Sequence, residues 1–161
     1  MNQHMLTRRG LLRHAVSGVA LASALHAQNR PANSRTRIRE TFDFGWKFLK
    51  GDSPGAEQTG FADSAWQPVD LPHDWSIEGP FGEKEQAQGS LPTGVGWYRK
   101  RFRAPAAYQD RTVVIEFDGI YQNSEVWING HYLGKRPYGY VAFSYDLTPH
   151  LNAGRDNAIA V

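Results

Sequence analysis

The sequence predicts an all-β fold, a sandwich or barrel of short strands. Three observations carry this prediction. Apolar and polar residues alternate with a period of two in several stretches, an Asn-Gly pair separates two β-rich runs, and no stretch after residue 40 has the spacing of an amphipathic helix. The chain has 161 residues, of which 40% are hydrophobic and 12% aromatic, enough to build the core of one domain.

Two aromatic-rich stretches open the β region. Phe42, Phe44, Trp46 and Phe48 alternate with polar or small residues, which predicts a strand with one buried and one solvated face. The stretch 97–103 alternates in the same way. Its arginines could form an anion-binding patch, but a solvated strand face is the favoured interpretation for Arg99, Arg101 and Arg103.

A hairpin is the clearest local signal. Asn129-Gly130 supplies the positive φ that both turn positions of a type I′ hairpin require. Residues 112–118 are β-branched and aromatic, which is typical of a central strand. The remaining expected strands cover 125–128, 131–133, 140–147 and 157–161.

Two further features bear on function. Residues 73–96 have little strand character, and a loop of that length inside a compact domain is often a binding loop. The last predicted strand stops at Val161, which would leave a sandwich with an unpaired strand edge. We therefore expect the sandwich to be truncated at its C-terminal strand, so that the chain is a fragment or a domain that other polypeptide completes.

The N-terminal segment 1–27 is expected to be an export signal. It joins a charged start, a short apolar stretch and small residues before a cleavage site, and Arg8-Arg9 followed by two leucines resembles a twin-arginine signal. An ordinary secretory signal is the alternative. Residues 28–39 are expected to be a linker, and the mature protein is expected to be periplasmic or extracellular.

Composition excludes several classes of function. The chain has no cysteine, which rules out disulfides, thiolate metal sites and a cysteine nucleophile. Arg8, Arg9 and Arg13 lie in the predicted signal, and without them the 16 acidic side chains outnumber the basic ones. The body is therefore not basic, and we expect no nucleic-acid partner. No apolar run of the mature chain is long enough to span a membrane.

Candidate ligand-binding residues are aromatic and acidic. Glu78, Glu83 and Glu85 share a loop with Asp74, but nothing in that loop holds two carboxylates at the fixed separation that glycoside hydrolysis needs. The histidines lack the spacing of metal ligands, so we expect neither a metal nor a cofactor. Five aromatic residues could stack on sugar rings or simply pack: Trp75, Phe81, Trp97, Tyr121 and Trp127.

Three stretches together resemble one family. They are Leu71-Pro72-His73-Asp74-Trp75, Gly96-Trp97-Tyr98-Arg99-Lys100 and the longer run from Phe117 to His131, Phe-Asp-Gly-Ile-Tyr-Gln-Asn-Ser-Glu-Val-Trp-Ile-Asn-Gly-His. In combination they are similar to the N-terminal sugar-binding domain of glycoside hydrolase family 2, the β-galactosidase type. The resemblance covers the predicted domain, residues 40–161.

The resemblance implies a jelly-roll β-sandwich that is similar to galactose-binding domains. It also implies an immunoglobulin-like domain and a TIM barrel as partners, with the two catalytic glutamates of a retaining enzyme on the barrel. No catalytic residue is therefore expected here. Five glutamates of this chain do not match the catalytic pair: Glu78, Glu83, Glu85, Glu116 and Glu125.

The resemblance also implies a substrate contact. In β-galactosidases an asparagine that follows the Asp-Gly strand end reaches the galactosyl unit, and Asn123 is the matching position. An amide side chain both donates and accepts, so it suits a sugar hydroxyl. The alternative is an asparagine that bonds its own backbone in a turn. Asp74 and Trp75 are expected near the same pocket.

The sequence therefore predicts the sugar-binding domain of a β-galactosidase-like hydrolase that cleaves O-glycosidic bonds, without the catalytic barrel. The chain alone is expected to be inactive. Two alternatives remain open, a free carbohydrate-binding module and a non-catalytic interaction domain with an exposed apolar patch. The sugar could be a galactoside, a glucuronide or a mannoside.

Overall fold

The computed structural model describes residues 37–78 and 92–161. The predicted signal, almost all of the predicted linker, and Phe81, Glu83 and Glu85 lie outside these residues. The chain divides into the units Met1–Glu40 and Thr41–Val161, and the fold belongs to the second unit. Its strands are β1 (Trp46–Lys50), β2 (Gln67–Val69), β3 (Gly96–Arg103), β4 (Val114–Phe117), β5 (Ser124–Ile128), β6 (His131–Arg136), β7 (Phe143–Asp146) and β8 (Asp156–Ala160).

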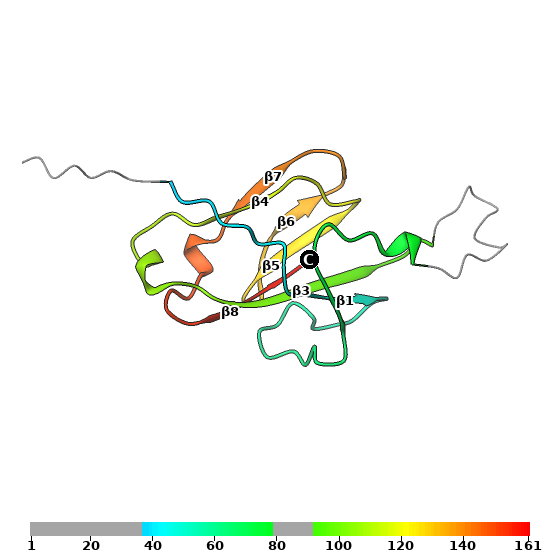
Figure 1. Ribbon diagram of the computed structural model, residues 1–161, viewed down its shortest axis with the longest axis horizontal. Helices are drawn as coiled ribbons and strands as arrows, with labels where there is room; N and C mark the ends of the chain where they lie inside the picture. Colours follow the sequence, from blue (N-terminus) through cyan, green and yellow to red (C-terminus); the bar gives the residue numbers. More distant parts are fainter. Residues whose placement is uncertain (1–36, 79–91) are drawn as a thin grey trace, which may run out of the picture. The chain divides into compact units, whose positions relative to one another are not determined.

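The strands form two antiparallel sheets that share one core (Figure 1). One sheet has six strands in the order β2-β1-β3-β8-β5-β6, and β4 and β7 form the other. The core combines Ile115 of the small sheet with Trp46, Phe48, Val126 and Ile159 of the large one. The described residues contain no α-helix, only the short 3₁₀ turns η1 (Trp75–Ile77), η2 (Ala106–Tyr108) and η3 (Thr148–His150). The all-β prediction is confirmed.

The first strand is shorter than its alternating pattern predicts. Phe44 is 65% exposed, so its expected burial is wrong. Gly45 has a φ of +72°, which breaks the extended backbone before the strand begins at Trp46. The carbonyls of Phe42 and Phe44 instead accept hydrogen bonds from Lys100 Nζ at 2.9 and 2.7 Å.

The prediction of a solvated arginine face on β3 is wrong for one of the three arginines. Arg99 is completely buried, whereas Arg101 and Arg103 are exposed. Arg99 donates to the carbonyl of Ala56 and, over 3.1 Å, to the carboxylate of Asp63. The segment 51–66 therefore covers this part of the strand, which alternation within one strand could not reveal.

The hairpin prediction is confirmed. Asn129 and Gly130 have φ values of 51° and 82°, and Ile128 pairs with His131 across the turn. The Asn129 side chain donates to the His150 carbonyl at 2.8 Å and accepts from the Ala158 amide at 2.9 Å. The turn is thus fastened to η3 and to β8.

The last strand, β8, lies inside the large sheet. It pairs with β3 from Asp156 to Ala160, and with β5 through Ile159 and Ala160. Val161 continues the ladder by exchanging two 2.9 Å backbone hydrogen bonds with Tyr98. Within residues 37–78 and 92–161, no helix combines the length and apolar character needed to cross a membrane.

Candidate functional site

The register of the large sheet places the predicted site residues at one end. Strands β3 and β5 both run antiparallel to β8, so they run parallel to each other on its two sides. Their starts, Gly96 and Ser124, therefore lie at the same end of the sheet (Figure 1). Trp75 packs against Gly96, and Asn123 immediately precedes Ser124.

Asp74 is exposed and caps the short turn η1. Its Oδ1 accepts hydrogen bonds from the Ser76 amide at 3.0 Å and from Ser76 Oγ at 2.6 Å. These two bonds to Ser76 hold the pKa of Asp74 below its ordinary value. The carboxylate is therefore charged at neutral pH and held in one orientation.

Trp75 has a packing role. Its ring stacks on Phe48 with centroids 6.3 Å apart, and Lys50 Nζ lies 4.9 Å from the ring centroid. A Cβ at Gly96 would lie 3.0 Å from Trp75 Nε1, so any larger residue here would require the indole to shift. The half-burial of Trp75 is explained by these contacts alone.

A histidine network that the sequence did not predict lies beside this turn. His73 Nδ1 is 2.8 Å from the Tyr98 hydroxyl, and His73 Nε2 is 3.0 Å from Glu78 Oε1. Burial, together with the charges of Asp74 and Glu78, raises the pKa of Tyr98 well above its ordinary value. Tyr98 therefore keeps its proton, donates to Nδ1 and favours the tautomer in which Nε2 donates to Glu78.

Asn123 is exposed and has a left-handed backbone, with a φ of 58°. Asparagine tolerates this conformation better than most residues. The backbone N–H of Asn123 donates to the Pro137 carbonyl at 3.2 Å, which ties the start of β5 to the end of β6. Within the described residues its side-chain amide makes no hydrogen bond, so the expected alternative, a bond to its own backbone, is not observed.

The other candidate aromatics separate into two groups. Trp97 and Trp127 stack on each other with centroids 5.3 Å apart, and Trp127 also contacts Tyr132. They lie on the outer face of the large sheet, because Trp127 shares a cross-strand row with Arg99 and Ala160. Tyr121 is 71% exposed on the connection between β4 and β5.

An ionic cluster on the outer face has a structural role. Asp63 is buried and accepts from Lys47 at 3.2 Å, Arg99 at 3.1 Å and Arg101 at 3.3 Å. Burial opposes ionisation of Asp63, but the bonds from Arg99 and Lys47 and the charge of Arg101 outweigh it and lower the pKa of Asp63. The cluster fastens the segment that carries Asp63 to β1 and β3.

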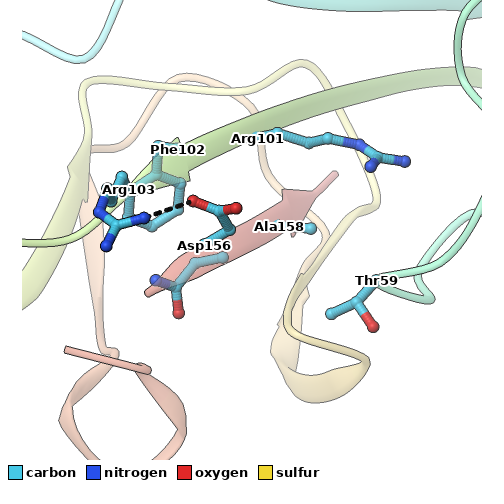
Figure 2. Close-up of a pocket in the computed structure, with 7 residues that line it drawn as sticks. Thr59, Arg101, Phe102, Arg103, Asp156 and Ala158 are labelled. Atoms are coloured by element: carbon cyan, nitrogen blue, oxygen red, sulfur yellow. Dashed lines mark ion pairs between the residues drawn. The ribbon is translucent and has the colours of Figure 1, made fainter. Parts of the chain in front are cut away.

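A hollow of about 290 Å³ lies at the opposite end of the large sheet (Figure 2). It is lined by the end of β3 and the start of β8, and Arg103 pairs with Asp156 there at 3.7 Å. None of the predicted site residues lines it. Among residues 37–78 and 92–161 no group of three potential ligands could hold a metal ion.

The sandwich and its match to a family model define the class of protein as a sugar-binding domain. Residues 56–161 match the model described as glycosyl hydrolases family 2, sugar binding domain, and the chain belongs to this family. The resemblance noted from the sequence motifs is thereby confirmed.

Similar proteins are considerably longer. The chain is 52% identical over 128 residues to the β-galactosidase BoGH2A of Bacteroides ovatus, a match covering 78% of this chain and 15% of that protein. It is 46% identical to a putative β-glucuronidase of Formosa agariphila, over 78% of this chain and 12% of that protein. A crystal structure of a β-glycosidase from Bacteroides vulgatus is 51% identical with a TM-score of 0.69, covering 74% of this chain and 16% of that one.

Proposed function

We propose that this chain is the sugar-binding sandwich of an exported β-galactosidase-like hydrolase, which cleaves O-glycosidic bonds. Membership of the family supports this, as does the higher identity to a β-galactosidase than to a putative β-glucuronidase. The composition of residues 1–27 supports export. The catalytic glutamates belong to a TIM barrel elsewhere in the enzyme, next to an immunoglobulin-like domain.

The observation that carries the proposal is the side chain of Asn123. It is exposed, it is unbonded within the described residues, and it stands where a rigid strand begins. Its amide group offers a donor and an acceptor to a sugar hydroxyl. Asp74, oriented by Ser76 at the same end of the sheet, supplies a further acceptor. This domain therefore shapes the substrate pocket and leaves bond cleavage to the barrel.

The positions of the acidic side chains also favour sugar binding without hydrolysis by this domain. Asp63 is the buried acid among the described residues, and its carboxylate is engaged by three cationic side chains. Retaining hydrolysis needs two carboxyl groups roughly 5 Å apart across a glycosidic bond. We therefore expect the chain to bind a β-galactoside without hydrolysing it.

Titration of the chain with methyl β-galactoside, followed by NMR, tests the proposal. Loss of one hydrogen bond in Asn123→Ala should weaken binding roughly threefold to tenfold. The matched control is Asn152→Ala, because Asn152 is also exposed and uses only its backbone atoms in hydrogen bonds. Equal affinity of the Asn123→Ala variant and the wild-type chain, or release of methanol by the chain alone, would contradict the proposal.

A further inference from the structure

Three tyrosines next to Asn123 are among the most exposed large side chains of the described residues. Tyr121, Tyr138 and Tyr140 are 71%, 62% and 76% exposed. The ring of Tyr140 is central, since its centroid lies 5.8 Å from that of Tyr121 and 5.8 Å from that of Tyr138. We call these three side chains the tyrosine cluster.

The backbone that carries the tyrosine cluster is closely packed. A Cβ at Gly119 would lie 2.7 Å from the carbonyl oxygen of Gly139, and a Cβ at Gly139 would lie 2.7 Å from Cα of Tyr121. The β4–β5 and β6–β7 connections thus meet backbone to backbone. The hydrogen bond from the backbone N–H of Asn123 to the Pro137 carbonyl joins the two connections a second time. The two loops therefore hold the backbone of the tyrosine cluster together.

The loops that carry the tyrosine cluster contain no cation. Residues 118–123 and 137–142 hold one charged side chain, the exposed carboxylate of Asp118, while Gln122 and Asn123 offer amide groups. The guanidinium of Arg136, the nearest cation along the chain, lies 5.4 Å from the Phe143 ring and 5.8 Å from the Tyr145 ring. The two loops thus combine aromatic faces and amide groups with one carboxylate and no cation.

We propose that Tyr121, Tyr138 and Tyr140 bind the C–H faces of neutral sugar units that extend from the unit held by Asn123. This inference rests on the proposed function and adds a second contact surface and a charge preference to it. A tyrosine presents an apolar ring and a hydroxyl, which match the two faces of a sugar. A uronate would bring a carboxylate to a surface without a cation in either loop.

The test compares tyrosine variants of the chain in NMR titrations with β-1,4-galactotetraose, using ring-labelled tyrosine. Tyr140→Ala and Tyr121→Ala should each weaken binding roughly threefold to tenfold, and Tyr140→Phe should keep most of the affinity. Tyr132→Ala is the matched control, because Tyr132 is also exposed but contacts Trp127 on the outer face. The four variants change three positions, all of them exposed tyrosine side chains, so the amide spectra should remain those of a folded chain.

The outcomes separate the inference from the proposed function. If the chain binds galactotetraose and the alanine variants bind it equally well, the inference is overturned and the proposed function stands. Equal affinity for tetragalacturonate would overturn the preference for neutral sugars. If neither methyl β-galactoside nor galactotetraose binds, both proposals fall. Self-association that Tyr140→Ala abolishes, without an effect on sugar binding, would make the cluster a protein interface and also overturn the inference.

Discussion

At the scale of single residues, Arg99 shows that a charged side chain on the outer face of a sheet can be buried. The segment 51–66 covers that face and supplies the partners of the guanidinium. The Arg99 guanidinium is fully buried and bonded to Ala56 and Asp63. One of its terminal nitrogens, Nη2, is buried without a hydrogen-bond partner. The guanidinium carbon lies 5.4 Å from the Phe61 ring, which supplies part of the missing interaction.

Removing this cation should destabilise the fold strongly. In Arg99→Met the buried carboxylate of Asp63 loses its most buried partner, so we expect a loss of about 3 kcal/mol in the free energy of unfolding. Urea denaturation measures this. The control Arg103→Met should change stability by less than about 0.5 kcal/mol, because that arginine is 71% exposed in its ion pair. Comparable losses in the two variants would show that Arg99 is not a structural anchor.

Asp63 should also make stability depend on pH. A carboxyl group whose pKa is lower in the folded than in the unfolded chain stabilises the fold above its unfolded pKa, about 3.9. That contribution is lost as the pH falls through the folded value. The urea midpoint should therefore drop as the pH falls below about 4, and less steeply in Asp63→Asn. Parallel curves for the two proteins would refute this role.

At the scale of elements, local chemistry determined which parts were predictable. The β5–β6 hairpin followed from Asn129-Gly130 because its turn requires positive φ at both positions. Strand β2 escaped prediction because it has three residues, one of them Pro68, and pairs on one side only. The segment 51–66 over β3 was invisible because long-range packing, not local pattern, brings Asp63 to Arg99.

The candidate site was likewise predictable only in part. Asn123, Asp74 and Trp75 came from a family resemblance, and their placement at one end of the sheet follows from strand order, which alternation does not encode. The bond between His73 and Tyr98 joins residues 25 positions apart, so no spacing rule pointed to it. The tyrosine cluster depends on two connections that meet at Gly119 and Gly139, a contact equally hidden in the sequence.

The hairpin turn should contribute to stability through both the side chain and the backbone of Asn129. Asn129→Ala removes the side-chain bonds to η3 and β8 and puts alanine, which tolerates a left-handed backbone less well than asparagine, at a φ of 51°, so a loss of about 2–3 kcal/mol is expected. Asn129→Gly keeps the backbone conformation and loses only the hydrogen bonds, so its loss should be smaller. Thermal unfolding of both variants measures the two contributions. Equal losses would mean that backbone strain at Asn129 is negligible.

At the scale of the whole molecule, the large sheet separates two ends with different chemistry. The end where β3 and β5 start carries Asn123 with the tyrosine cluster, together with the exposed acids Asp74 and Asp118. The opposite end carries the hollow with Arg101, Arg103 and Asp156 (Figure 2). The first end offers aromatic and amide groups without a cation, and we expect a neutral sugar to bind there.

The most direct test is a map of amide chemical-shift changes on the chain titrated with methyl β-galactoside. We predict changes centred on Asn123 and on the β4–β5 and β6–β7 connections, with smaller ones at Asp74 and Ser76. Residues 101–103 and 156–158 should remain unchanged. Changes confined to those two segments, or no change anywhere at saturating sugar, would contradict this prediction.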